Sequence, residues 1–144
     1  MIDWSKPDDK VSKYFTVEEA LLLLTWRRMA DESDGLTDDI KSDIIKAALI
    51  FDKVREFLGE PMHVHSFYRP AAYSARVGGS ATDVHVHGIA MDFHVSSKSC
   101  DEVKAILMPK LKELGIRMED NGKGAGWVHI DIREPGPSGR FFKP

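Results

Sequence analysis

The 144-residue sequence is poor in cysteine, in long apolar runs and in charge of one sign. Its single cysteine, Cys100, excludes an intramolecular disulfide and a cysteine-rich zinc site. The apolar block Leu21–Leu24 is far too short to span a bilayer. Twenty basic residues against 23 acidic ones give a net charge of −3, which argues against nucleic acid as the main partner. These absences favour an ordinary globular protein.

The organisation of the chain is simple, since no repeat, low-complexity tract or long linker divides it. We therefore predict a single domain over residues 1–144, and we expect it to be a monomer. Its parts would be a helical N-terminal region at about 1–60, a core at about 61–134 and a tail rich in proline and glycine at 135–144. The N-terminus is polar and has no hydrophobic signal core, so we expect synthesis in the cytoplasm.

Three helices are predicted from capping signals and apolar spacing. Capping boxes open the first helix at Thr16–Glu19 and the third at Ser99–Glu102. Pro109 lies inside the third helix, where we expect a kink or a break. The predicted helical ranges are 16–30, 38–58 and 99–115, with a polar loop at 30–35 between the first two.

Strands are predicted where short apolar runs alternate with polar residues. The ranges are Met62–Phe67, Ile89–Val95, Trp127–Ile132 and a short fourth strand, Ile116–Glu119. The final segment should lie over the surface or fray, with Phe141 and Phe142 able to fix it. Together these elements predict an α+β fold, in which helices pack on one side of a small, mostly antiparallel sheet.

Metal-capable side chains fall on one face of two of these strands. Because side chains alternate along a strand, Asp92 and His129 both project away from their apolar neighbours. His85 precedes Asp92 in a glycine-flanked loop that could fold over it. Two histidines and an aspartate make a three-ligand set for zinc, with a fourth position open for water, and such a site suits amide hydrolysis. The alternation pattern alone is equally consistent with a metal site and with side chains that are packed or solvated and bind no metal.

Two motifs resemble a known family. Residues 66–92, SFYRPAAYSARVGGSATDVHVHGIAMD, are similar to the pattern S-G-Y-R-S-P-x-x-N-x-x-V-G-G-x-x-x-S-x-H-x-x-G-x-A-x-D of zinc D-Ala-D-Ala carboxypeptidases and related peptidoglycan endopeptidases. Residues 126–133, GWVHIDIR, look like that family's closing W-V-H-V-D-V-R strand. The resemblance implies the Hedgehog/D-Ala-D-Ala peptidase fold, with the metal site on the sheet face opposite the helices.

The resemblance also implies an activity and its site. One Zn²⁺ would be held by His85, Asp92 and His129, and Arg69 would face the substrate or the developing oxyanion. The reaction would hydrolyse an amide bond in peptidoglycan stem peptides, as a D,D-carboxypeptidase or an endopeptidase, and so degrade the cell wall. The chain is similar to phage endolysins, which reach the wall after release from the cell. Export of a bacterial enzyme by another route remains open.

Further residues receive roles from their place in the motifs. His87 and Trp127 are expected on the substrate side, and His94 in a contact with the ligands or the substrate. Asp83 would either orient His85 or cap the turn. The sequence departs from the pattern at Phe67, Pro70 and Ser74, which replace other residues or shift their position.

The catalytic base is the weakest part of the resemblance. Some branches of the family carry an acid three residues before the last histidine ligand, where this chain has Gly126. Other branches place it at the end of the preceding strand, which here offers Glu119 and Asp120. We select Glu119, because it lies in the opposite alternation phase from Ile116, and hold Asp131 as the fallback.

Two other readings stay open from the sequence. The fold could retain its metal without activity, as a binding module or a virion component. Gly126 supports that reading, because it stands where some branches of the family carry the catalytic acid. Alternatively, His87 or His94 could add a fourth ligand and close the site as a structural zinc clip. His63 and His65 share a strand face, where we expect them to line the sheet.

Overall fold

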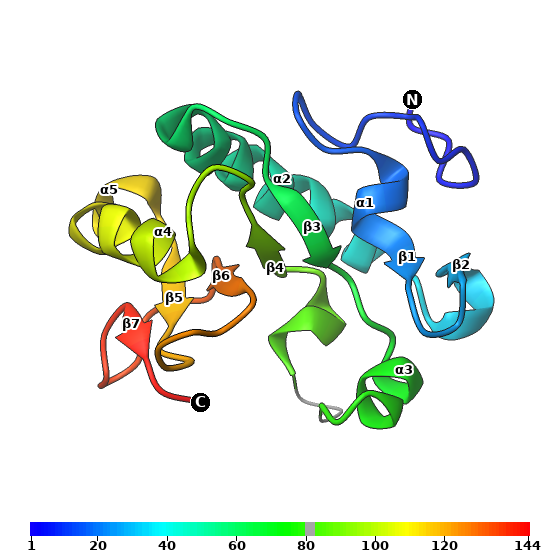
Figure 1. Ribbon diagram of the computed structural model, residues 1–144. Coiled ribbons are helices and arrows are strands. Elements are labelled where there is room, and N and C mark those ends of the chain that lie inside the picture. Colours follow the sequence, from blue (N-terminus) through cyan, green and yellow to red (C-terminus); the bar gives the residue numbers. More distant parts are fainter. Residues whose placement is uncertain (80–82) are drawn as a thin grey trace.

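The structure is a computed structural model that describes residues 1–79 and 83–144 (Figure 1). Its main sheet has the strand order β3-β4-β6-β5-β7. All neighbouring strands in it are antiparallel except β5 and β7, which are parallel. The strands are β3 (His63–Ser66), β4 (Ala90–His94), β5 (Arg117–Glu119), β6 (Val128–Asp131) and β7 (Phe141–Phe142). The predicted α+β class is confirmed.

The second and third predicted helices are confirmed, and the residues that predicted their ends have those roles in the structure. Helix α2 (Asp38–Leu58) is capped by the Thr37 side chain and ends at Gly59, which adopts the left-handed conformation that favours glycine. The third helix is interrupted at Pro109 as predicted. It divides into α4 (Cys100–Leu107), the 3₁₀ turn η3 (Met108–Lys110) and α5 (Leu111–Leu114).

The first predicted helix is wrong beyond its first turns. Its capping box forms, but α1 (Val17–Leu21) has only five residues and is followed by a hairpin of β1 (Leu22–Leu23) and β2 (Arg28–Met29). The reason lies in its carbonyl groups. The carbonyl of Ala20 accepts a hydrogen bond from the distant amide of Tyr68, and that of Leu21 accepts one from Ala30. These contacts replace those that would continue the helix.

The C-terminal tail is fixed by Phe141 and Phe142, as the sequence allowed, but it is held as a strand. Its residues do not simply cover the surface, because Phe141–Phe142 forms the edge strand β7. The amides of Met118 and Asp120 on β5 donate to the carbonyls of Arg140 and Phe142. Three further elements occupy segments for which no regular structure was predicted: η1 (Glu32–Asp34), α3 (Ala71–Arg76) and η2 (Val84–His87). Residues 80–82 of the first motif lie outside the described residues.

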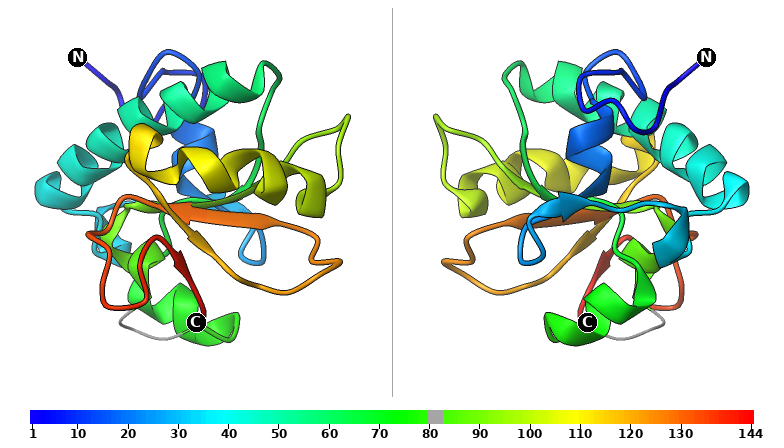
Figure 2. Two further views of the ribbon diagram at one scale, coloured as in Figure 1. Left: turned by 90° about the vertical axis from the view of Figure 1, so that its left-hand side faces the viewer. Right: turned by 90° about the vertical axis from the view of Figure 1, so that its right-hand side faces the viewer.

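The two faces of the sheet have different neighbours. Helices α2 and α4 lie on one side of the strands, and α3 lies on the other (Figure 2). The core contains Met91 of β4 and Ile130 of β6, which are fully buried and directly opposite each other. Asp92 and His129 are the next pair in the same register, so their side chains share the other face.

No helix within the described residues is long and apolar enough to cross a membrane.

The packing of α2 generates a stability prediction. Phe51 is fully buried and meets Phe67 edge to face, with ring centroids 5.4 Å apart. Phe51→Ala should lower the free energy of unfolding by about 3–5 kcal/mol, because it leaves a cavity in the core. Leu49→Ala on the same helix is the control, since Leu49 is exposed and its loss should change stability by less than about 0.5 kcal/mol. Urea denaturation of both variants tests this, and equal losses would contradict it.

Candidate metal centre

Three of the predicted ligands come together in the structure. His85 from η2, Asp92 from β4 and His129 from β6 are all buried, and each offers a ligand atom within 4.8 Å of the other two. Within the described residues this is the one group of three or more such side chains that could hold a metal ion. The cross-strand pairing of β4 with β6 brings two of them together, and the turn η2 adds the third.

His85 is oriented by the backbone. Its Nδ1 lies 2.8 Å from the carbonyl oxygen of Phe67, and because a carbonyl only accepts, Nδ1 must carry the proton. Its Nε2 is therefore the ring nitrogen that faces the other two residues of the group. Within residues 1–79 and 83–144 this buried atom has no hydrogen-bond partner, although Asp92 Oδ1 lies 3.3 Å away. A buried polar atom without a hydrogen-bond partner is costly, and coordination of a metal ion by this nitrogen would satisfy it.

His129 is held by carboxylates on both sides of its ring. Its Nδ1 donates to Asp92 Oδ1 at 2.8 Å, and its Nε2 donates to Asp131 Oδ2 at 3.0 Å. Asp131 is fully buried and accepts two hydrogen bonds from Arg117, at 2.8 and 2.9 Å. The structure thus places Asp131, the fallback base, on the side of the ring away from Asp92. There it fixes the orientation of His129, as carboxylates commonly do behind metal-binding histidines.

Asp92 is oriented by Arg69. The guanidinium Nη2 donates to Asp92 Oδ2 at 2.9 Å, while Nε donates to the hydroxyl of Ser66 at 2.7 Å. The other carboxylate oxygen, Oδ1, is the one that faces both His85 and His129. Arg69 therefore contacts a predicted ligand directly, and it also lines the pocket in front of the group.

The charges around the group favour a cation at its centre. Burial by itself would raise the pKa of Asp92, but its contacts with His129 and His85 outweigh burial and hold that pKa well below its usual range. Burial would lower the pKa of His129, but Asp131 and Asp92 outweigh it and raise that pKa to about 9. Positive charge is thus stabilised between these carboxylates, and a metal ion would have to displace the proton on Nδ1.

Glu119 lies at the edge of the group. Its Oε2 is 3.8 Å from His129 Nδ1, and its side chain is only 19% exposed. Burial raises the pKa of Glu119, an effect that His129 partly offsets. Such a shift moves a carboxylate toward the range where a general base works near neutral pH. Its neighbour Asp120 points elsewhere, since its Oδ1 accepts a hydrogen bond from the Gly122 amide.

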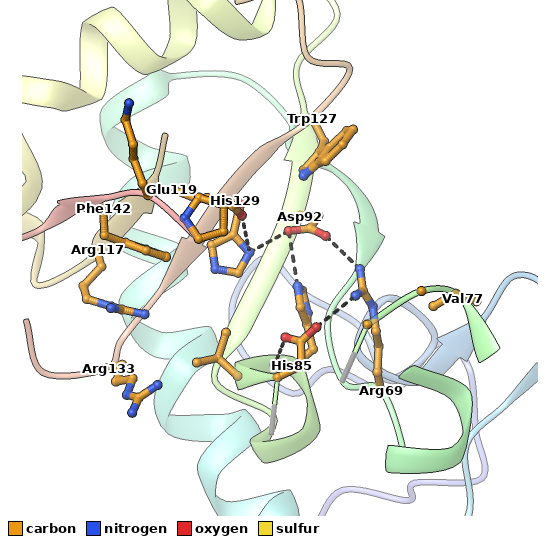
Figure 3. Close-up of a pocket in the computed structure, with 16 residues that line it drawn as sticks. Arg69, Val77, His85, Asp92, Arg117, Glu119, Trp127, His129, Arg133 and Phe142 are labelled. Carbon is orange, nitrogen blue, oxygen red and sulfur yellow. Dashed lines mark hydrogen bonds and ion pairs between the residues drawn. The ribbon is translucent and has the colours of Figure 1, made fainter. Parts of the chain in front are cut away.

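These residues open onto a pocket of about 680 Å³ (Figure 3). Trp127, one of the predicted substrate contacts, lines it and remains 41% exposed. Asp83 also lines it, and its Oδ1 caps η2 by accepting a hydrogen bond from the His85 amide. Gly79 packs so closely that a Cβ there would lie 2.4 Å from Ser74 Oγ. Gly79 of the first motif therefore permits a close approach beside the pocket.

Two predicted residues lie away from this pocket. His87 is exposed at the end of η2 and does not line it. His94 shares a 2.6 Å hydrogen bond with His65 and stacks on His63 at 4.8 Å between centroids. These three histidines therefore lie together on the sheet, as expected for His63 and His65. His94 does not contact the metal-capable group.

Two residues near the group were not singled out from the sequence. Arg117 pairs with Asp131 across β5 and β6, and the ring of Phe142 on β7 lies 3.9 Å from its guanidinium carbon. Strand alternation could have identified Arg117, because it places Arg117 on the same face of the strand as Glu119. The position of Phe142 had no comparable signal, since it depends on the parallel pairing of β7.

The comparisons with known proteins agree with this geometry. No curated protein and no solved structure matches the chain significantly. The family model described as Peptidase M15 matches residues 13–131, which is most of the chain and includes all three metal-capable residues. This match confirms the resemblance to zinc D-Ala-D-Ala peptidases that the two motifs indicated, and the chain therefore belongs to the peptidase M15 family.

Proposed function

We propose that this peptidase is zinc-dependent and hydrolyses an amide bond in peptidoglycan stem peptides. The observation that carries the proposal is the group of His85, Asp92 and His129, in which the buried Nε2 of His85 has no hydrogen-bond partner within the described residues. A carboxylate poised to act as a base and an arginine line the same pocket. We further propose that the protein acts on the cell wall after release from the cell, as endolysins do.

The donor set fits zinc. Two imidazole nitrogens and one carboxylate oxygen form a set that leaves a fourth position for water or substrate. When bound, the ion would polarise the scissile carbonyl and lower the pKa of water at that position. His94 and His87 do not reach the group, so the geometry supports an open site over a structural clip.

The surrounding residues have separate tasks in the proposed reaction. Glu119 accepts a proton from the attacking water as the new C–O bond forms, and passes it to the leaving nitrogen as the C–N bond breaks. Arg69 holds Asp92 in place and presents positive charge toward the carbonyl oxygen. Asp131 and Arg117 keep the ring of His129 in one orientation.

The charge of the pocket supports an acidic peptide as substrate. Arg133 and Lys143 both line it, and neither forms an ion pair within the part of the chain that is described. Stem peptides carry free carboxylates, which such side chains attract. The exposed ring of Trp127 adds an apolar wall for the peptide.

The metal site is tested by a pair of histidine variants in one turn. The wild-type protein should bind one Zn²⁺ per chain, and His85→Ala should lose it, because the carboxylate and one remaining histidine make a much weaker site. His87→Ala is the matched control and should bind zinc as the wild type does. Zinc content after dialysis, measured by atomic emission, checks this. Retention of zinc by His85→Ala would exclude the proposed ligand set.

The base is tested by two neighbouring carboxylates. Glu119→Gln should lower kcat/KM by roughly 100-fold or more, because it removes the proton acceptor and keeps the shape of the side chain. Asp120→Asn is the control and should keep full activity, since its side chain accepts a hydrogen bond from the nearby Gly122 amide and does not line the pocket. The assay is hydrolysis of purified peptidoglycan with mass spectrometry of the products, on proteins of confirmed zinc content.

Two outcomes would contradict the proposed roles. Full activity of the Glu119→Gln variant would move the base to another residue. If the zinc-loaded wild type cuts no stem peptide at all, the activity proposal fails, and a metal-binding module or virion component of the same fold takes its place.

A further inference from the structure

A second pocket continues the first one past the metal-capable group. It has a volume of about 320 Å³ and shares four lining residues with the larger pocket, namely Arg69, Val77, Asp92 and Trp127. Its remaining lining residues are Leu24, Thr25, His65, Ser66 and Tyr73. Since the shared residues form the boundary between the two spaces, the pockets are two halves of one groove.

The wall of this second pocket is a fixed part of the fold. The β1–β2 hairpin places Leu24 and Thr25 at its turn, and the Thr25 amide donates to the hydroxyl of Tyr73 on α3 at 3.1 Å. Trp26 packs on the same ring, edge to face, with centroids 5.0 Å apart. The hairpin is therefore tied to α3, and together they form one side of the groove.

The groove gathers exposed apolar side chains. Leu24 is 58% exposed, Trp127 41% and Val77 39%, and all three line the second pocket. Exposed apolar side chains that converge on a concave surface mark a binding site more often than scattered ones do. The continuity of this surface with the proposed reaction site indicates that the substrate peptide covers it.

The metal-capable group lies between the two ends of the groove. In Figure 3, Trp127, Arg69 and Val77 lie on one side of Asp92, and Glu119 and Phe142 lie on the other. A scissile bond at the group would therefore have space on both sides. The volumes of 680 and 320 Å³ each fall within the roughly 300–1,000 Å³ of pockets that enclose whole small molecules. Neither half is limited to a single alanine residue.

We infer that the enzyme is an endopeptidase, which binds at least two residues of the stem peptide on each side of the bond it cuts. This inference rests on the proposed function and selects between the two reactions that function includes. Carboxypeptidase action requires a subsite for one terminal residue and a cation for its carboxylate. In the second pocket the guanidinium of Arg69 is held by Asp92, Ser66 and Asp83, the last at 3.4 Å. The cations Arg133 and Lys143, unpaired within the described residues, line the larger pocket, whose volume of about 680 Å³ has room for more than one terminal residue.

The first test identifies the products. The zinc-loaded wild type is incubated with free stem pentapeptide, with disaccharide pentapeptide and with a cross-linked muropeptide, and the fragments are weighed by mass spectrometry. Every cleavage should leave at least two amino acids on each side of the broken bond. Release of single C-terminal residues as the main product would overturn the inference while leaving the proposed hydrolysis intact.

The second test measures binding without turnover. In the zinc-loaded Glu119→Gln protein, adding Leu24→Ala should weaken binding of the intact pentapeptide about three- to tenfold, because an apolar contact is lost. Leu49→Ala is the matched control, an equally exposed leucine on α2 that lines none of these pockets, and it should leave the affinity unchanged. Isothermal titration calorimetry provides the dissociation constants.

The two tests separate two kinds of failure. Binding that depends on Leu24 without any cleavage would support the second subsite and refute the proposed function. If the wild type cleaves the peptide but Leu24→Ala leaves the dissociation constant unchanged, the function is supported and the subsite is refuted. If the peptide neither binds nor is cut, both are refuted.

Discussion

The contact on which the site depends is the pair of Asp92 and His129, opposite each other on β4 and β6. One oxygen of Asp92 faces both His85 and His129 in a buried setting, where an unpaired charge would be expensive. That oxygen can face them because the other is held by Arg69. The register of two adjacent strands therefore sets the geometry of the metal-capable group, and a slip of β6 by one residue would turn His129 toward the core and away from Asp92.

Charges of opposite sign continue across the sheet from this pair. The sequence of contacts runs from Arg69 to Asp92, His129, Asp131 and Arg117, so that each cation lies between carboxylates or beside one. Buried pairs of this kind contribute little net stability, because desolvation offsets their attraction, but removal of one member leaves its partner uncompensated. The arrangement is best understood as a way of fixing orientation. It keeps ring nitrogens and carboxylate oxygens directed at one point, which a metal site requires.

Elements at the two ends of the chain complete the site. The edge strand β7 brings Phe142 over Arg117, and the β1–β2 hairpin builds the far wall of the groove. Neither element contributes a metal-capable residue, yet one supports the charge network and the other extends the space in which a peptide can lie. The family motifs supply the chemistry of the site, whereas these flanking elements shape what it can bind.

The sequence by itself determined the features that depend on local pattern. Strand alternation put Asp92 and His129 on the polar face, and capping boxes marked the starts of α1 and α4. The family resemblance pointed to an acid at the end of the strand before His129, and alternation then selected Glu119, which lies near the site.

Only the tertiary structure decided the features that depend on partners far away in the chain. The leucine-rich segment after Glu19 follows a capping box that predicts a longer helix, but a hydrogen bond from the Tyr68 amide to the Ala20 carbonyl ends the helix early. The tail becomes a strand because β5 has free edge amides to pair with it. Asp131 faces the same side as His129 by alternation, yet Arg117 and the far nitrogen of the ring determine what it contacts. Periodicity gives the face of a side chain, and only the packed fold gives its partner.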